Sequence, residues 1–429
     1  MTVRDDLDRG ASGTTPTAPP SLWRDRDFVR LLSGETISQL GSQITLYALP
    51  MTAVLLLGAS AGQIGLLKTV FTVPYFIFPL AVGVLLDRRR RKPAMLVANA
   101  GRALLVFSIP VLAWQHVLSM NQLYMVAFAG GAFSVLFDLA YSSYLPRLIG
   151  RPRLADANSK LQTGASVAFL SGPGIAGLLV GAVGAATALV ADALSYVLSF
   201  VNIATLRYRE PPPADTPRRH PVAEAREGVV ALFTIPPVRQ IALHAAIFNG
   251  SVQLVEVAFV VYALRVYHIG PSLFGLVVTV GGIGGLIGAL TGARIAKRFG
   301  YGRALLAAVA AESVTFFLLP AVHGDRLVLA AQFALTFCIA GAGTGAANVI
   351  TATVRQACTP DRLMARVGAG YRMMNLGAVP LGAAVAGVLV SAIGVHATLW
   401  VAPFGLVASI LPLALTSYRR MRELPTVEG

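Results

Sequence analysis

The sequence predicts an all-α membrane protein with twelve transmembrane helices, arranged in two pseudo-symmetric halves of six. Three observations support this prediction: an apolar composition, a series of long apolar spans and an internal repeat. The chain of 429 residues is 55% hydrophobic and 13% charged, whereas soluble domains carry about 25% charged residues. The composition therefore excludes an ordinary soluble fold.

Twelve apolar spans are each long enough to cross a bilayer, because about 20 helical residues at 1.5 Å per residue cover its roughly 30 Å hydrocarbon core. The spans lie at 33–57, 63–86, 94–114, 122–145, 160–183, 185–206, 240–263, 272–294, 303–321, 327–348, 366–391 and 394–416. This series predicts a multi-pass protein of the cell (plasma or inner) membrane, surrounded by lipid bilayer.

The cations recur in short clusters between the spans. All but four of the 35 Lys and Arg residues lie in the N-terminal segment, in the loops after even-numbered spans or at the C-terminal end. Cytoplasmic loops are enriched in Lys and Arg, so both termini are expected in the cytoplasm. Because the cations are not gathered in one basic domain, the net charge of +15 does not indicate nucleic-acid binding.

An internal repeat relates two parts of the chain at a constant offset of 209 residues. Val29-Arg30 corresponds to Val238-Arg239, and Gly83 corresponds to Gly292. Repeated halves are typical of transporters. We therefore expect a disordered cytoplasmic tail at 1–27, an N-terminal six-helix half at 28–206, a cytoplasmic linker at 207–239, a C-terminal six-helix half at 240–417 and a cytoplasmic tail at 418–429.

The loop between the second and third spans carries a distinctive motif, "GVLLDRRRRKPAML". The pattern G-x-L-x-D-R-x-G-R-K is matched by Gly83, Asp87, Arg88, Arg91 and Lys92. Arg90 stands where the pattern has its second glycine. With this motif the chain resembles the major facilitator superfamily over essentially its whole length. The resemblance implies that the loop controls interconversion between inward-open and outward-open states, and that the protein is a monomer.

Span five carries a second motif, "SGPGIAG". Gly172, Pro173 and Gly177 resemble the G-P-x-x-G-G element of exporters in this superfamily, with Ala176 in place of one glycine. The stretch 137–158 resembles the branch that contains enterobactin exporters and macrolide efflux pumps. The resemblance implies export of a small amphipathic molecule, such as a drug, a siderophore or a related metabolite, driven by an ion gradient that is usually of protons.

Small residues on span five also predict a close helix contact, because glycines let two backbones approach each other. Span eight offers a surface of the same kind through Gly284, Gly288 and Gly292, which lie four residues apart. These three glycines are expected to offer span five a matching surface, with ordinary small-residue packing as the alternative for span eight.

Charged side chains inside spans are costly and therefore mark candidate functional residues. Arg102 and Asp138 lie at similar depths on spans three and four, which predicts a structural ion pair, with a proton site as the alternative. Lys68 on span two and Glu256 on span seven lie near the outer face of opposite halves. We expect these two to form an outer gate, in which Glu256 takes up a proton when the pair opens. Separate partners for the two side chains are the alternative.

Two polar stripes follow the spacing i, i+4, i+7, which places each stripe on one helical face. They consist of Glu35, Gln39 and Ser42 on span one and of Asn249, Gln253 and Glu256 on span seven. The stripes predict the walls of one water-filled cavity. A contact with lipid headgroups or with a neighbouring cation is the alternative for Glu35.

The sequence contains no G-x-x-x-x-G-K-[ST] and no H-E-x-x-H motif, so neither ATP-driven transport nor metalloprotease chemistry is expected. Cys338 and Cys358 have no metal-binding spacing. We therefore expect no enzyme, no metal site and no cofactor; the expected partners are a small-molecule substrate and protons. Two alternatives stay open: proton-coupled uptake by symport, and a non-transporting membrane sensor with the same fold.

Overall fold

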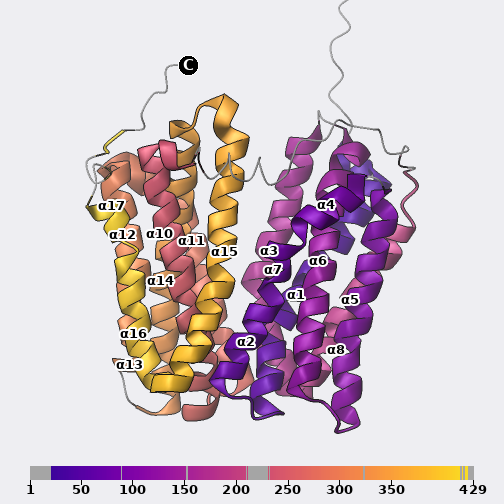
Figure 1. Cartoon of the computed structure of the whole chain (residues 1–429), viewed down its shortest axis with the longest axis horizontal. Coiled ribbons are helices and arrows are strands. Elements are labelled where there is room, and N and C mark those ends of the chain that lie inside the picture. The colour runs from indigo at the N-terminus through magenta and orange to yellow at the C-terminus, as the bar shows by residue number, and fades with distance from the viewer. Residues whose placement is uncertain are drawn as a thin grey trace, which may run out of the picture.

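The computed structural model of the protein describes residues 21–87, 89–150, 153–208, 210, 230, 232–321, 324–415, 418 and 421–423. Within these residues the chain forms helices and no β-strand, which confirms the all-α prediction. Figure 1 shows two groups of helices side by side, with α1 to α8 forming the N-terminal half and α10 to α17 the C-terminal half.

The N-terminal half begins with a short 3-10 turn, η1 (Leu22–Arg24), inside the segment that was expected to be a disordered tail. Leu22 of this turn is buried. The helices of this half are α1 (Arg26–Leu55), α2 (Ala61–Thr72), α3 (Pro74–Ile77), α4 (Pro79–Asp87), α5 (Arg91–Trp114), α6 (Met120–Ile149), α7 (Leu154–Val183) and α8 (Ala185–Ala204).

The C-terminal half contains a π-helix, η3, which continues α10, and a short 3-10 turn, η4. Its elements are α10 (Pro236–Val261), η3 (Tyr262–Val266), α11 (Pro271–Phe299), α12 (Tyr301–Val314), η4 (Thr315–Phe317), α13 (Leu318–Ala321), α14 (Arg326–Cys358), α15 (Asp361–Ile393), α16 (Val395–Ala408) and α17 (Leu411–Ala414).

Ten helical segments among the described residues are long and apolar enough to cross a membrane. The two other predicted spans correspond to α1 and to the series α2, α3 and α4. Pro74 and Pro79 each begin a new helix in this series, because proline lacks the N–H that an uninterrupted helix needs. The second predicted span is therefore a broken helix.

Single glycines connect consecutive helices at equivalent places in the two halves. Gly184 (φ 86°) joins α7 to α8, and Gly394 (φ 83°) joins α15 to α16. Left-handed backbone of this kind favours glycine, which has no Cβ. The matching turns give the internal repeat a structural counterpart.

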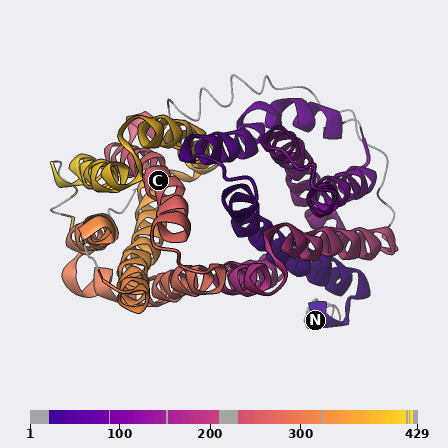
Figure 2. The ribbon, with the colours of Figure 1, turned by 90° about the horizontal axis from the view of Figure 1, so that it is seen from below.

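The halves meet at one end of the molecule. We call the end at which α1 begins the terminal face, and the end that carries residues 56–60 the distal face. In Figure 1 the halves approach each other at the bottom, beside α2, and stand apart at the top. Figure 2 shows the two junctions from the distal face, with α7 beside α11 and α2 beside α15.

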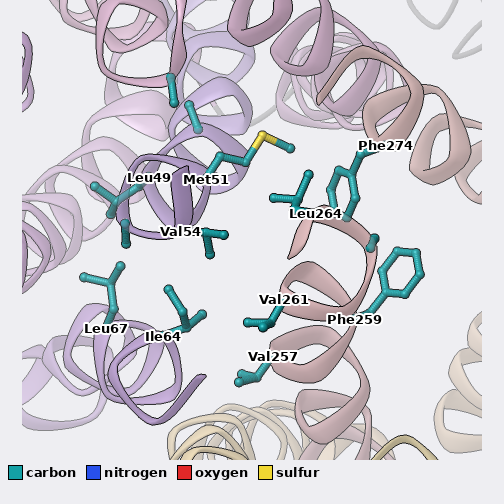
Figure 3. Packing of buried hydrophobic residues seen from close by; sticks show 14 of the residues in the cluster. Leu49, Met51, Val54, Ile64, Leu67, Val257, Phe259, Val261, Leu264 and Phe274 are labelled. Carbon is teal, nitrogen blue, oxygen red and sulfur yellow. The ribbon is translucent and has the colours of Figure 1, made fainter. Parts of the chain in front are cut away.

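The buried apolar side chains follow the same division. Toward the distal face, one continuous cluster includes residues of both halves. Figure 3 shows part of it, with Leu49 and Val54 of α1 and Leu67 of α2 facing Val257 and Val261 of α10. Toward the terminal face, each half has a separate cluster of its own. The structure is thus closed at the distal face, and its halves are separate at the terminal face.

Candidate functional site

Two cavities lie in the middle of the molecule. The inter-half cavity, of about 180 Å³, is lined from both halves and mainly by apolar and aromatic side chains, among them Tyr47, Phe71 and Phe259. The N-terminal cavity, of about 220 Å³, is lined by α1, α5, α6, α8 and the broken second span. Both cavities are lined by Thr45, Leu49 and Phe71, so the two are adjacent.

An ion pair lies on the wall of the inter-half cavity. Lys68 of α2 donates a hydrogen bond to the Oε2 atom of Glu256 of α10. The Lys68 side chain is 25% exposed and that of Glu256 is 49% exposed, so both face open space. The pair that the sequence predicted is formed, and it joins the two halves.

Three further hydrogen bonds join the halves near the distal face. Thr69 donates to the carbonyl of Pro380 (3.3 Å), and Ser272 donates to the carbonyl of Gly177 (3.3 Å). Arg265 donates to the carbonyl of Val54 (3.0 Å). These bonds involve backbone carbonyls, which any residue supplies, so sequence reasoning could not find them.

The N-terminal cavity contains the whole predicted stripe of α1, because Glu35, Gln39 and Ser42 all line it. The Gln39 amide donates to Glu35 Oε1 (2.7 Å), and Glu35 Oε2 is buried without a hydrogen-bond partner among the described residues. Ser42 Oγ lies 2.9 Å from Tyr196 Oη on α8. An unpartnered carboxylate oxygen is costly in such a site, so this atom can accept a proton or a ligand donor.

The predicted ion pair between Arg102 and Asp138 is not formed within 4.0 Å. The Arg102 guanidinium is buried and hydrogen-bonded to Asn99, one turn earlier on the same helix. Its Cζ atom lies 4.4 Å from the ring centroids of both Phe137 and Tyr196. An amide and two aromatic faces therefore contact the cation, while its Nε atom is buried without a hydrogen-bond partner among the described residues. Asp138 is left exposed to the cavity.

The stripe of α10 behaves differently from that of α1. Asn249 donates to the Ala245 carbonyl of its own helix (2.8 Å), and Gln253 is buried. Neither residue lines the inter-half or the N-terminal cavity, whereas Glu256 of the same stripe lines the inter-half cavity.

Asp192 of α8 is a buried acid on the sixth predicted span. Its carboxylate accepts hydrogen bonds from Thr45 of α1 and from Ser195 (3.1 Å). A Cβ atom at Gly41 would lie 2.7 Å from Ser195 Cβ, so glycine allows this close approach of α1 and α8. Thr45 lines both cavities, and its hydrogen bond to Asp192 holds the Thr45 hydroxyl in place.

The cationic loop motif leads into the start of α5. Asp87 ends α4, and Arg88 lies outside the described residues. The Lys92 ammonium donates to the carbonyls of Ala204 (3.0 Å) and Leu206 (2.7 Å), at the end of α8. A Cβ atom at Gly83 would meet no atom within 4 Å, so packing in this structure does not require glycine there.

Glu210 is the acidic partner of this loop, and the sequence analysis missed it. Its carboxylate accepts from the backbone N–H of Arg91 (2.6 Å) and from the Arg91 guanidinium (3.1 Å). Arg147 of α6 lies 3.5 Å from the same carboxylate. The side chain is only 2% exposed. The sequence feature that could have indicated this role is a single acid directly before three prolines. It was overlooked because it lies in the predicted linker.

Gly177 of span five lies at the crossing of the two halves. A Cβ atom at Gly177 would lie 2.8 Å from the Cα atom of Gly275 on α11. Gly172 instead faces Gln43 of α1, and Pro173 lies inside α7. For Gly284, Gly288 and Gly292 of span eight the alternative of ordinary small-residue packing is correct, because they pack against α14 within the C-terminal half and not against span five.

Two helical halves with cavities at and beside their junction define a multi-pass membrane transporter. A family described as "Transmembrane secretion effector" matches residues 17–427. The chain belongs to this family, in the efflux branch of the major facilitator superfamily.

Named relatives are exporters. The multidrug efflux pump Tap of Mycolicibacterium fortuitum is 30% identical over 403 residues, which cover 90% of this chain and 93% of that protein. The enterobactin exporter EntS of Citrobacter koseri is 25% identical over 372 residues, covering 86% of this chain and 87% of that protein. The present protein is therefore a transporter that exports small molecules.

Solved structures show the same fold at low identity. A bacterial homologue of the iron transporter ferroportin in an inward-facing state superposes with a TM-score of 0.74 at 14% identity, covering 92% of this chain and 98% of that one. The nucleoside transporter NupG superposes with a TM-score of 0.74 at 13% identity, covering 91% and 98%.

Proposed function

We propose that the protein is a proton-coupled exporter of amphipathic small molecules, which works by alternating access in the cell membrane with both termini in the cytoplasm. The observation that carries this proposal is the asymmetry of the junction between the halves. A continuous apolar core and the Lys68–Glu256 pair close the distal face, while separate cores lie at the terminal face. With cytoplasmic termini this is an inward-open state, the state in which an exporter loads its cargo.

The linings of the two cavities favour an amphipathic cation as cargo. Aromatic and aliphatic side chains dominate the inter-half cavity, which suits an apolar body. The adjacent N-terminal cavity contains two acids, Glu35 and Asp138, against one cation, Arg102. Arg102 bonds to Asn99 and stacks on two rings, and neither acid forms an ion pair with it within 4.0 Å. We therefore assign to these acids the binding of a positive group of the cargo. One chain supplies both cavities, so a monomer suffices.

Glu256 is the best placed proton carrier of the inter-half cavity. It is the one acid among the residues that line this cavity. Opening of the distal face separates Glu256 from Lys68, and an unpaired carboxylate next to apolar surface is costly. Proton uptake removes this cost. Proton entry from the outside would thereby accompany distal opening and drive export of the cargo.

The cargo class is tested by uptake into inside-out membrane vesicles, using one lipophilic cation, one neutral analogue and one catecholate anion of similar size. We expect accumulation of the cation, and a loss of at least about tenfold in its uptake in the double variant Glu35→Gln/Asp138→Asn. The neutral analogue should be taken up equally by both proteins. Asp156→Asn is the matched control, because Asp156 pairs with Lys160 within α7, away from both cavities.

Three outcomes contradict parts of this proposal. Preferential uptake of the anion would contradict the cationic cargo class. Movement of cargo into the cytoplasmic compartment would indicate symport. If correctly folded protein transports none of the probes, a non-transporting membrane sensor would be supported.

A further inference from the structure

The distal end of α10 is irregular. Residues Tyr262–Val266 form a π-helical turn, in which the N–H of Tyr267 donates to the carbonyl of Tyr262 (3.1 Å). Turns of this type are rare and occur frequently at functional sites. This turn lies six residues after Glu256, on the same helix and next to the same junction between the halves.

Arg265 extends from the π-helical turn into the other half. Its guanidinium donates to the carbonyl of Val54 (3.0 Å), in the last turn of α1. Carbonyls in the last turn of a helix lack a partner within the helix, and a cation is favoured at this negative end. The contact therefore satisfies an acceptor of the N-terminal half with a charge of the C-terminal half. It is separate from the Lys68–Glu256 pair.

A chain of side-chain hydrogen bonds connects the π-helical turn to α16. Trp400 Nε1 lies 3.2 Å from His396 Nε2. His396 Nδ1 lies 3.3 Å from Tyr262 Oη, and Tyr262 Oη lies 3.2 Å from Tyr267 Oη. Tyr262 is the first residue of the π-helical turn, and Tyr267 is the residue that follows it and closes it.

The chemistry of the groups fixes the direction of this chain. An indole N–H can only donate, so His396 Nε2 accepts the bond from Trp400. A neutral imidazole with an accepting Nε2 carries its proton on Nδ1, which therefore donates to Tyr262. The Tyr262 hydroxyl in turn donates to Tyr267. Every member has the partner that its chemistry requires, and α16 thereby holds the first residue of the turn that bears Arg265.

We propose that Arg265 is a second distal latch, which holds the two halves closed at this face, and that His396 is a positioning residue that holds the π-helical turn in place. The latch acts on the same closed state as the Lys68–Glu256 pair but through a different helix of the N-terminal half. It rests on the proposed alternation between two states and is independent of the cargo and of the coupling ion.

The test measures opening of the distal face directly. Spin labels are attached at Val117→Cys and Leu327→Cys, two exposed positions near the distal ends of the two halves, in a background with Cys338→Ala and Cys358→Ala. Pulsed electron paramagnetic resonance then gives the distribution of distances in liposomes without cargo. We expect Arg265→Gln to raise the ratio of distally open to closed molecules about two- to fivefold, the range that a lost charge–helix-end contact implies.

Two variants separate the roles of the residues. His396→Asn keeps a donor near Tyr262 and should behave as the parent protein, whereas His396→Phe removes the donor and should match Arg265→Gln. Arg326→Gln is the control, because Arg326 is an exposed cation of the same face with no hydrogen bond or ion pair to the other half among the described residues.

An unchanged distance distribution in Arg265→Gln would overturn the latch, and equal behaviour of His396→Asn and His396→Phe would overturn the positioning role. If Lys68→Gln opens the distal face in the same experiment, alternation stands and only the latch fails. If no variant ever populates an open state, the proposed alternation itself fails.

Discussion

Lys68 of α2 donates a hydrogen bond to Glu256 of α10 and so connects the two halves of the protein across the inter-half cavity. The contact lies at the end of the molecule where one apolar core spans both halves. The two residues are 188 positions apart in the sequence. We therefore expect the pair to exist only while the distal face is closed.

Reversal of one charge of this pair should open the distal face. Lys68→Glu places two acids together, and repulsion should raise the distally open fraction in the spin-label experiment described above. The double reversal Lys68→Glu/Glu256→Lys should restore the parent distribution, because a direct pair couples non-additively. Lys160→Glu, which disturbs a pair within α7, should have no effect. Failure of the double reversal to restore closure would contradict a direct contact.

Removal of the buried acid Glu210 should destabilise the N-terminal half. Loss of one partner from a buried ion pair costs about 3–5 kcal/mol, because the remaining charge is left without compensation. Glu210→Ala should therefore lower the melting temperature in detergent markedly, while Glu423→Ala, at an exposed position, should not. Equal melting temperatures would mean that Arg91 and Arg147 find other partners.

The loop after α4 should be required for cycling rather than for folding. Asp87→Asn keeps the size of the side chain and removes its charge, so we expect transport to stop with the melting temperature unchanged. Arg90→Ala should keep the parent transport rate, because Arg90 stands outside the matched residues of the motif. A normal transport rate in Asp87→Asn would contradict the assignment of this loop as a conformational switch.

A single methyl group at the α7–α11 crossing should be enough to disturb the closed state. The Cβ atom of Gly177→Ala would lie 2.8 Å from the Cα atom of Gly275, and backbone cannot yield as a side chain can. We expect reduced transport and a larger distally open fraction. Gly368→Ala is the matched control, since a Cβ atom there would meet nothing within 4 Å. Equal effects of the two substitutions would contradict a role for this crossing.

The sequence predicted the all-helical membrane fold, because each long apolar span can be recognised from its own residues. It also predicted the Lys68–Glu256 contact, since two charges of opposite sign lie at one depth in opposite halves. The same argument was wrong for Arg102 and Asp138. Depth along a helix says nothing about its rotation, and Arg102 instead bonds to Asn99 and lies against two aromatic rings.

Other features of the site depend on contacts between distant residues, which no local sequence pattern predicts. Glu210 lies in the segment that was predicted to be a linker, and its burial follows only from its contacts with Arg91 of α5 and Arg147 of α6. Arg265 bonds to a backbone carbonyl, and a carbonyl carries no sequence signature. The stripe of α10 was predicted as a cavity wall; Glu256 lines the inter-half cavity, whereas Gln253 is buried.

Proton coupling through Glu256 is the central claim, and proton movement in reconstituted liposomes tests it most directly. Purified protein is placed in vesicles that contain a pH-sensitive dye, and a transported lipophilic cation is added under an imposed proton gradient. We predict cargo-dependent proton movement that is lost in Glu256→Gln and kept in Glu423→Gln. Undiminished proton movement in Glu256→Gln would contradict the claim and place the coupling proton elsewhere, with Glu35 and Asp138 as the next acids to test.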